Sequence, residues 1–397
     1  MANDSERFAF SEKQRHWVSK IGEIADRHTD GARIADETNG LNRPLLEELQ
    51  SIGYCALAVP ESSGGLGFSV YDFLLCQERL AQADGPSALA LGWHHTTLYD
   101  LGQTGEWDRA LYRKLCEEVV TGGALINRAD SEKATGSPSR GGKPQTTARR
   151  SEHGGYALSG RKTFTSLSTA LDYFIVSAVD EETGEVAEFL LPHGTPGVSI
   201  EETWDMVGMR GTASHDLVMD NAELPASAKA YVRSGAGKPH GNPYLLNIPA
   251  VYLGIAGAAR NEAVAFAARY QPNSLDKPIA HVPHIREKIG RMELELSAAR
   301  RFLYGVAAQW DRDKESAPER LPGLRAELAA VKTFAIQTAI SVVDTAMRVF
   351  GAHGLASSSP MQRHYRDVRF GPSNPPMDDS TLNLLADRAL SEVVPEE

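Results

Sequence analysis

The feature that most limits how this chain can fold is a change in the spacing of its apolar residues. Between residues 289 and 310, and again between 327 and 350, apolar side chains recur at alternating intervals of three and four. That spacing places them on one face of an α-helix. Between about residues 122 and 237, short runs rich in β-branched and aromatic residues are separated by Gly, Pro, Ser or Asp, which is typical of β-strands. Two helical regions therefore enclose one β region.

The predicted fold is mainly α with a small β domain. We expect an N-terminal helical domain over residues 1–121, a middle antiparallel β-sandwich or barrel over 122–237, and a C-terminal four-helix bundle over 238–397. The expected strands are 124–127, 156–158, 172–179, 187–191, 198–200 and 216–219. Because residues 130–150 are rich in Gly and Pro, we expect a long mobile loop there.

Composition excludes several classes of function. The net charge is −11 and no run of Lys or Arg is longer than two residues, so nucleic acid is not an expected partner. Three cysteines without a CxxC pair predict neither a disulfide framework nor structural zinc, and no metal site is expected. The chain lacks an N-terminal signal pattern and an apolar run of about twenty residues, so we expect no membrane association and a cytoplasmic location.

Two stretches of the β region combine residue types that suit a planar ligand. In GRKTFTS, Phe164 stands beside the hydroxyls of Thr165 and Ser166, so an aromatic ring and polar donors come together. In WDMVGMRGTASHD, glycines and small residues allow close backbone approach, and Arg210 could hold a carboxylate or phosphate. The alternatives are an ordinary strand for the first stretch, a tight turn for the second, and a domain-interface ion pair for Arg210.

The stretch from Gly351 to Asp379 separates two helical patterns. It contains four helix breakers, Gly371, Pro372, Pro375 and Pro376, and it ends on two carboxylates. We expect an irregular loop of nearly thirty residues here, and loops of that length are more often functional than idle.

Together with PESSGGLG, REKIGRMELELSAARRFLY and VFGAHGLASSSPMQRHYRDVRF, these stretches resemble the acyl-CoA dehydrogenase family of flavoproteins over nearly the whole chain. The resemblance implies an oxidoreductase of fatty acid metabolism that desaturates an acyl-CoA thioester between its α and β carbons and passes hydride to FAD, with FMN as the alternative cofactor. It also implies a homotetramer or dimer, in which two chains build one site, and an electron-transfer partner or flavin reductase.

The same resemblance assigns roles to individual residues. The flavin ring is expected against Leu125, Ile126, Asn127, Phe164, Thr165 and Ser166. The adenine half is expected against Arg348, Gly351, Ala352 and Gly354 of a neighbouring subunit, and the substrate against Ser137, Arg210 and Ser214.

The sequence departs from the family pattern at the catalytic base. An ungapped alignment of Tyr365-Arg366-Asp367 puts Pro375 where the family has a glutamate, and the alternative position, near Ile248, has no acid nearby. Asp378 and Asp379 are the nearest carboxylates, and burial beside a flavin would raise the pKa of such a group. The alternative is that one of them, or Ser380, caps the last helix.

Two further departures concern the cofactor. Arg128 stands where the family usually has an acid, and residues 272–276 lack the arginine of the family's Arg-x-x-Phe-Gly motif. Relatives of this architecture without the glutamate include two-component monooxygenases, which use reduced flavin and oxygen. For that reaction His94, His95, Ser166 and His364 are the residues to consider. A non-catalytic flavin-fold binding protein is the third interpretation.

Overall fold

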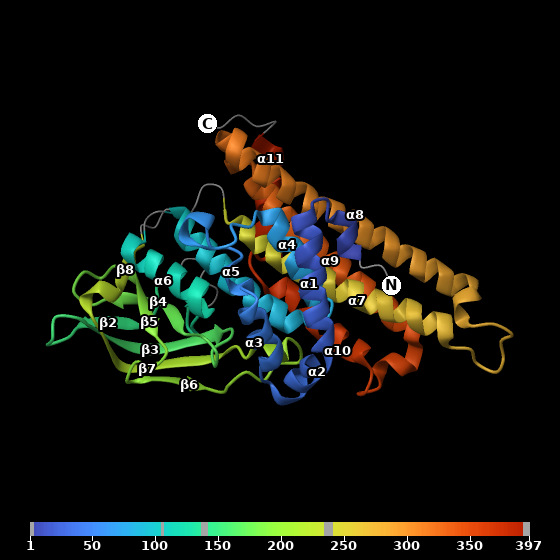
Figure 1. Cartoon of the computed structure of the whole chain (residues 1–397), viewed down its shortest axis with the longest axis horizontal. Helices are drawn as coiled ribbons and strands as arrows, with labels where there is room; N and C mark the ends of the chain where they lie inside the picture. Colours follow the sequence, from blue (N-terminus) through green and yellow to red (C-terminus); the bar gives the residue numbers. More distant parts are fainter. Residues whose placement is uncertain (1–3, 105–106, 136–141, 234–240, 392–397) are drawn as a thin grey trace.

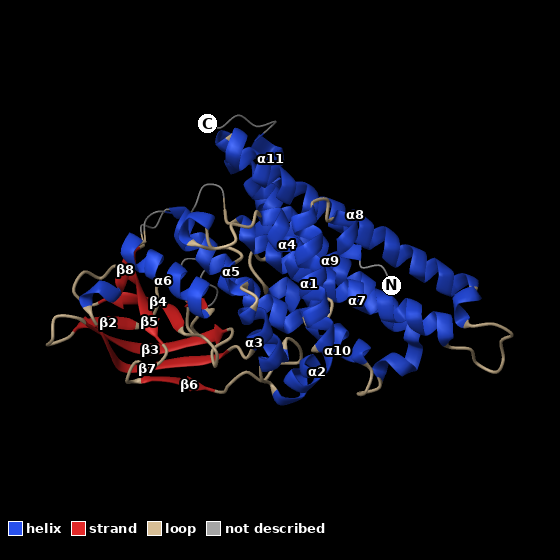
Figure 2. Ribbon diagram, viewed as in Figure 1, coloured by secondary structure: helices blue, strands red, loops and turns tan. Residues whose placement is uncertain are grey.

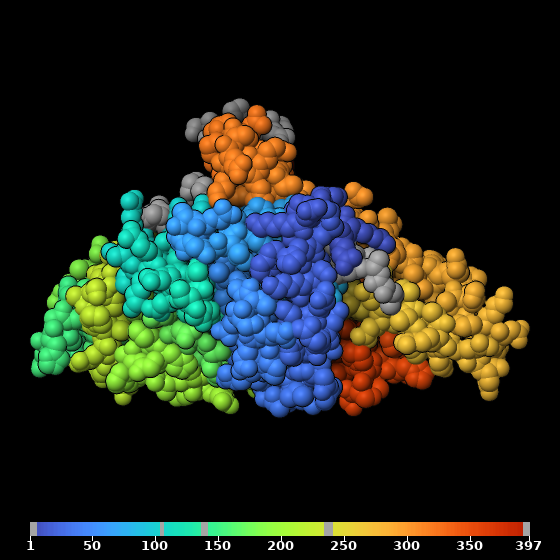
Figure 3. All heavy atoms as spheres, viewed as in Figure 1, coloured from blue at the N-terminus to red at the C-terminus, as the bar shows by residue number. Residues whose placement is uncertain are grey.

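The computed structural model describes residues 4–104, 107–135, 142–233 and 241–391. Figure 1 shows the β domain at one end of an elongated molecule, the long helices of the C-terminal bundle at the other, and the N-terminal helices across the middle. All strands lie in the β domain (Figure 2). In the space-filling view the N-terminal helices cover the junction of the other two regions (Figure 3). The predicted arrangement of helical, β and helical regions is confirmed.

The N-terminal helices are α1 (Glu12–Arg27), α2 (Thr29–Thr38), α3 (Arg43–Ser51), α4 (Val70–Ala81), α5 (Gly85–Thr104) and α6 (Arg109–Gly122). The first begins with a capping box, in which Ser11 and Gln14 each accept from the other's backbone amide. Gly53 has a φ of 79° directly after α3, as a terminating glycine would. Most described residues of α5 are buried, because this helix packs on α4, α7 and β1.

The β domain is one eight-stranded sheet in the order β6-β7-β3-β2-β4-β5-β8, with β1 beside β4. Its strands are β1 (Ile126–Ala129), β2 (Thr147–Arg150), β3 (Tyr156–Thr165), β4 (Tyr173–Asp180), β5 (Val186–Pro192), β6 (Val198–Glu201), β7 (His215–Leu224) and β8 (Lys229–Val232).

Two predictions about this sheet need correction. Most pairs are antiparallel as predicted, but β1 and β2 both run parallel to β4. The expected long loop over 130–150 ends earlier, because residues 147–150 form β2. The parallel pairing involves β4, which lies well after β1 and β2 in the chain, and local composition does not encode such a partner.

The bundle consists of α7 (Asn247–Arg269), α8 (Pro283–Ser316), α9 (Arg325–Phe350) and α11 (Asp378–Ser391). The apolar residues that predicted α9 are buried, as are those of α8 from Met292 to Trp310. Among the described residues, one helical segment, 318–355, has the length and apolar composition of a membrane span. A share of 56% of its most apolar window is buried and it packs on α7 and α8, which are the properties of a core helix.

The prediction that residues 351–379 form an irregular loop is wrong. This stretch contains short 3-10 helices, η10 (Gly351–Leu355) and η11 (Val368–Ser373), and between them α10 (Pro360–Asp367). Ser359 caps α10 by accepting a hydrogen bond from the Met361 amide, and Pro360 takes a first-turn position where its missing N–H has no cost.

Candidate functional site

Backbone strain gathers where β3 ends and β7 begins. Six non-glycine residues of the described chain have a positive φ, and four of them lie in two short segments. These are Phe164 (56°), Leu167 (63°), Met209 (51°) and Ala213 (43°). Such a conformation costs a non-glycine residue on the order of 1–2 kcal/mol, and it is retained where function requires it. The two segments are therefore the first candidates for a functional site.

Hydrogen bonds hold the two segments together. The Leu167 amide donates to the Thr212 carbonyl (3.0 Å), and the Ser168 hydroxyl donates to the Ala213 carbonyl (2.8 Å). The Ser214 hydroxyl lies 2.9 Å from that of Ser166 and 2.8 Å from that of Thr212. The strained backbone thus supports a chain of three buried hydroxyls.

Asn127, on β1, extends this polar group. Its Nδ2 donates to the Ser166 carbonyl (3.2 Å), and its Oδ1 accepts from the Arg128 amide (2.8 Å). Thr165 Oγ1 is buried without a hydrogen-bond partner among the described residues. We call these residues the hydroxyl cluster: Asn127, Thr165, Ser166, Thr212 and Ser214.

An aromatic wall stands beside the hydroxyl cluster. The Phe164 side chain is 55% exposed. Its ring meets Trp204 edge-on at 5.7 Å and 78°, and Trp204 lies 5.9 Å from the ring of Phe370 on η11. An exposed aromatic face next to a buried hydroxyl that lacks a partner fits a planar ring with a polar edge, which is the shape of a flavin.

The segment that carries Trp204 is locked to both helical domains. Arg210 donates to the Asp36 carbonyl on α2 (2.6 Å) and to the Met206 carbonyl (3.0 Å). Arg210 therefore lies at the domain interface, held by backbone carbonyls, and its nearest carboxylate is Asp205 on its own segment (3.5 Å). Its predicted contact with substrate stays a prediction. Arg366 on α10 pairs with the Asp36 carboxylate at 2.6 and 2.9 Å.

Asp367, on the bundle side, makes a further hydrogen bond between these domains. It accepts from the amide of strained Met209 (2.6 Å), and burial raises the pKa of its carboxyl to about 6. The backbone of α10 lies so close that a Cβ on Gly208 would collide with the Arg366 carbonyl.

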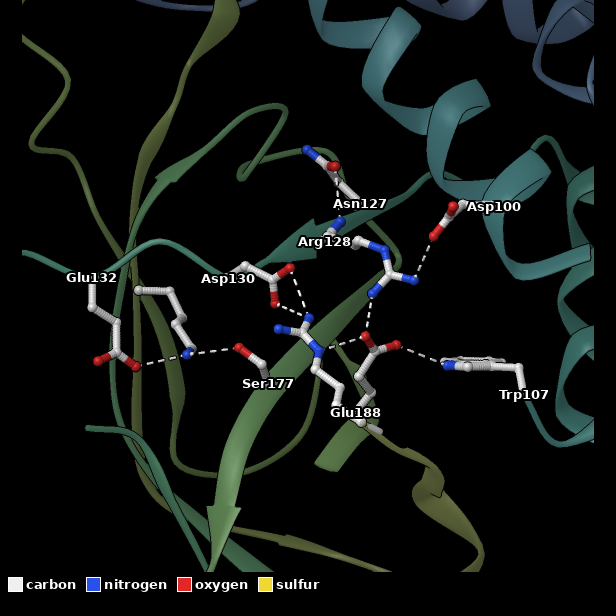
Figure 4. Close-up of polar contacts among 10 residues, drawn as sticks. Asp100, Trp107, Asn127, Arg128, Asp130, Glu132, Ser177 and Glu188 are labelled. Atoms are coloured by element: carbon white, nitrogen blue, oxygen red, sulfur yellow. Dashed lines mark hydrogen bonds and ion pairs between the residues drawn. The ribbon is translucent and has the colours of Figure 1, made fainter. Parts of the chain in front are cut away.

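An ionic network occupies the other side of β1. Arg128 pairs with Asp100 on α5 (3.0 Å) and with Glu188 on β5, and the Trp107 indole also donates to Glu188 (3.0 Å). Arg233 binds Asp130 at 2.8 and 2.9 Å and Glu188 at 2.9 Å. Figure 4 shows the Asn127 side chain pointing away from this network.

The network was missed in the sequence, where Arg128 stood out only as a departure from a family pattern. The sequence feature that could have predicted the network is a charged residue within or beside a strand, since Glu188 lies in one short predicted strand and Arg128 directly follows another. Burial alone would raise the pKa of Asp130, but Arg233 and Arg128 hold that pKa below its ordinary value. The charges are therefore matched inside the domain.

Comparison with known proteins identifies the family. The three acyl-CoA dehydrogenase family models match in order: the N-terminal domain over residues 11–117, the middle domain over 129–222 and the C-terminal domain over 246–373. The chain belongs to the acyl-CoA dehydrogenase family. Putative acyl-CoA dehydrogenase YdbM of Bacillus subtilis is 47% identical over 382 residues, which are 96% of this chain and 98% of that protein.

Two solved structures share the acyl-CoA dehydrogenase fold. Butyryl-CoA dehydrogenase from Megasphaera elsdenii has a TM-score of 0.84 at 24% identity and covers 96% of this chain and 98% of its own. TdsC from Paenibacillus, solved with FMN and indole, has a TM-score of 0.82 at 21% identity and covers 96% of this chain and 98% of its own. At these identities the likeness concerns the fold.

The carboxylates predicted as the base of this acyl-CoA dehydrogenase family member are the first two residues of α11. Asp378 accepts from Lys332 (3.1 Å), Thr333 (3.2 Å) and Gln337 (3.3 Å), all on α9. Asp379 is exposed, and its Oδ1 accepts from the Ser380 amide at the start of α11 (2.9 Å). The structure thus gives both carboxylates local partners and does not bring them into the hydroxyl cluster, and their catalytic role stays a prediction.

The histidines considered for a monooxygenase are core residues. His94 accepts from the Ile126 amide at Nδ1 (3.1 Å), so Nε2 carries the hydrogen that it donates to the Cys55 carbonyl (2.9 Å). Burial lowers the pKa of His94 to about 4 and that of His95 well below its ordinary range. His364 is buried on α10, 3.6 Å from Glu262.

The remaining predicted contacts are spread more widely. Leu125 donates its amide to Asp172 (2.7 Å), and the amide of Ile126 is bonded to His94, so both are already engaged. The four residues predicted for the adenine half, Arg348, Gly351, Ala352 and Gly354, lie together at the end of α9 and in η10. Arg348 pairs with Asp344 on its own helix (2.8 Å). Ser137, predicted to contact substrate, lies outside the described residues.

Proposed function

We propose that this protein is a flavin-dependent monooxygenase, which takes reduced flavin and oxygen and oxygenates a small substrate. The observation that carries the proposal is the neutrality of the hydroxyl cluster. Among the described residues, the hydrogen-bond partners of Asn127, Ser166 and Ser214 are hydroxyls and backbone groups, and none can take a proton at neutral pH. Desaturation of a thioester needs such a base, whereas oxygenation needs hydrogen-bond donors around the reacting oxygen.

We assign the following roles to the residues of the aromatic wall and the hydroxyl cluster. Phe164 and Trp204 would hold the flavin ring by aromatic contact, and Thr165 and Ser166 would donate hydrogen bonds to its polar edge. When bound, a reduced flavin supplies the two electrons needed to place one atom of oxygen in the substrate and to reduce the other to water. The Ser214 and Thr212 hydroxyls would help to orient the Ser166 hydroxyl.

We propose FMN as the cofactor, with FAD as the alternative to be measured. FAD needs a further cationic or stacking site for its adenine half. Arg348, predicted for that role, is already paired with Asp344, and residues 272–276 carry no cation. These observations favour the shorter flavin.

Desaturation of an acyl-CoA is the second candidate, which the 47% identity with YdbM favours. In that reaction Asp378 would have to leave Lys332 to act as the base. Burial lowers the pKa of Lys332 while Asp378 opposes that shift, so Asp378 is already engaged as the partner of a buried cation.

The assembly follows from the same proposal. Exposed apolar side chains lie on α9 and α11, namely Phe334, Leu382 and Leu390. They support a homodimer or homotetramer, which light scattering of the purified protein would measure. A separate flavin reductase would supply the electrons in oxygenation, and an electron-transfer flavoprotein would accept them in desaturation.

One experiment separates the candidates. Flavin fluorescence titration first measures the affinity for FMN and FAD. The loaded protein is then given a flavin reductase, ¹⁸O₂ and indole, the small molecule present in the TdsC structure. Incorporation of ¹⁸O into the product supports the proposal. Anaerobic bleaching of the flavin by a panel of acyl-CoA thioesters would establish desaturation instead, and bound flavin that neither oxygen nor thioester turns over would indicate a non-catalytic flavin-binding protein.

A further inference from the structure

The side-chain amide of Asn374 has a fixed orientation. Its Nδ2 donates to the Tyr252 hydroxyl oxygen on α7 (2.8 Å) and to the Phe370 carbonyl (3.0 Å). A carbonyl oxygen can only accept, so the NH₂ group must face Phe370 and the amide oxygen must face elsewhere. A flipped amide would place two oxygens against each other.

The Asn374 oxygen is therefore an acceptor without a donor. Among the described residues no hydrogen-bond partner reaches Oδ1, and the side chain is only half-buried. The partner that holds the amide stays neutral. Tyr252 is fully buried, and burial together with the nearby Asp367 carboxyl raises the pKa of its phenol. Its hydroxyl oxygen thus remains a neutral acceptor for the amide at neutral pH.

Asn374 belongs to the bundle side of the aromatic wall. It directly follows η11, whose Phe370 ring packs on Trp204 (5.9 Å), which in turn meets Phe164. The next residue is Pro375, which the family resemblance puts at the position of the missing glutamate. An uncharged acceptor thus stands one residue before the position where relatives have an anionic base.

We propose that Asn374 determines substrate specificity, its Oδ1 accepting a hydrogen bond from an N–H or O–H group of the substrate, and that Tyr252 is the positioning residue that orients it. The substrate class is then a small uncharged molecule with a donor close to the atom that is oxidised. This inference deepens the proposed function and rests on it for the reaction.

Matched probe pairs that differ by one donor test the inference. Indole is compared with 1-benzofuran, and aniline with toluene, by calorimetric titration of the FMN-loaded protein. One hydrogen bond to a neutral acceptor contributes about 0.5–1.5 kcal/mol, so the wild type is expected to bind the donor member of each pair roughly 3- to 10-fold more tightly.

Three variants isolate the residue responsible. In Asn374→Ala the donor preference is expected to fall to about 1. In Tyr252→Phe it is expected to fall part of the way, since the amide loses one of its two anchors. Ser373→Ala, an exposed neighbour, should keep the wild-type preference and serves as the matched control. Thermal unfolding of each variant shows whether the fold is retained.

The outcomes separate the inference from the proposed function. Equal affinities within each pair for the wild type, or failure of both donor probes to bind, would overturn the role of Asn374. A uniform loss of all four probes in Asn374→Ala would also overturn it, because a structural role alone leaves the ratio unchanged. If the wild type takes up no flavin, the proposed function fails, and the same ratios measured on flavin-free protein still decide the role of Asn374.

Discussion

The two sides of β1 differ in a way that separates scaffold from site. Arg128 points into an ionic network in which each charge meets an opposite one, whereas its neighbour Asn127 joins a cluster without any charge. Adjacent residues of a strand face opposite sides of the sheet, so one residue step divides the two environments. The charges on one side hold elements together, and the neutral side keeps hydrogen-bonding capacity for a ligand. In this protein, the ion pairs on one side of β1 therefore stabilise the fold, and the buried uncharged polar groups on the other side are the candidates for ligand binding.

Breaking the ionic network should give the largest effect. Glu188 accepts from Trp107, Arg128 and Arg233, so Glu188→Ala leaves the buried Trp107 indole and two half-buried arginines each short of one partner. We expect a loss of about 3–5 kcal/mol in the free energy of unfolding, measured by urea denaturation. Glu182→Ala, which removes an exposed pair with Arg150, is the matched control with an expected loss below about 1 kcal/mol. Equal losses of unfolding free energy in Glu188→Ala and Glu182→Ala would show that the ionic network beside β1 does not stabilise the fold more than an exposed ion pair does.

Changing the hydroxyl cluster should affect activity more than stability. Ser166→Ala removes the hydroxyl that Ser214 orients, at a cost in unfolding free energy of about 1 kcal/mol. Turnover with reduced flavin and oxygen is expected to fall on the order of 100-fold, as for other preorganised donors. The control is Ser159→Ala on the same strand, whose hydroxyl accepts from the exposed Asn221 amide. Unchanged turnover in Ser166→Ala would contradict a direct role for the cluster.

Asp367, a buried carboxyl where α10 meets the segment bearing Trp204, should make the free energy of unfolding depend on pH. The pKa of Asp367 is raised to about 6 from the model-compound value of 3.8, so between these values the folded state binds more protons than the unfolded state. Its contribution to stability therefore declines as the pH rises from about 4 to about 6. Asp367→Asn keeps an acceptor for the Met209 amide and should flatten this part of the curve of unfolding free energy against pH. A wild-type slope that persists in the variant would assign it to other groups.

The smallest effect is expected at the predicted base. Because Asp378 pairs with Lys332 on α9, Asp378→Asn should change turnover with reduced flavin and oxygen by less than about 2-fold and cost up to about 1 kcal/mol in stability. If acyl-CoA-dependent bleaching of the flavin occurs in the wild type and disappears in this variant, Asp378 is the base and desaturation replaces oxygenation as the function.

The sequence predicts the helices well because their packing faces repeat within one turn or two. All seven positions that predicted α9, from Leu328 to Val349, are buried, and six of them are apolar. Strand pairing is harder to predict from the sequence, because β2 pairs with β3 and β4, which lie after it in the chain. α10 was missed because glycine and proline signals around it outweighed its own short apolar face.

The candidate site was predictable in part. The resemblance put Asn127, Thr165 and Ser166 against one ring and Ser214 against the substrate, and the structure brings these residues together. The partners that decide their chemistry were not predictable, because each comes from a distant element. The orientation of the Asn374 amide depends on Tyr252 on α7, and Asp378 has a partner because Lys332 on α9 lies opposite it. The sequence shows which side chains are present, whereas the tertiary contacts determine what each of them can do.

The tight fit at Gly208 has a consequence for the aromatic rings nearby. The backbone of Arg366 on α10 lies so close that a Cβ at position 208 would come within 2.4 Å of its carbonyl oxygen. Any side chain there would push α10 away from the segment that carries Trp204, and with it the neighbouring Phe370 ring. A residue without a side chain at this position therefore allows the rings of Trp204 and Phe370 to meet.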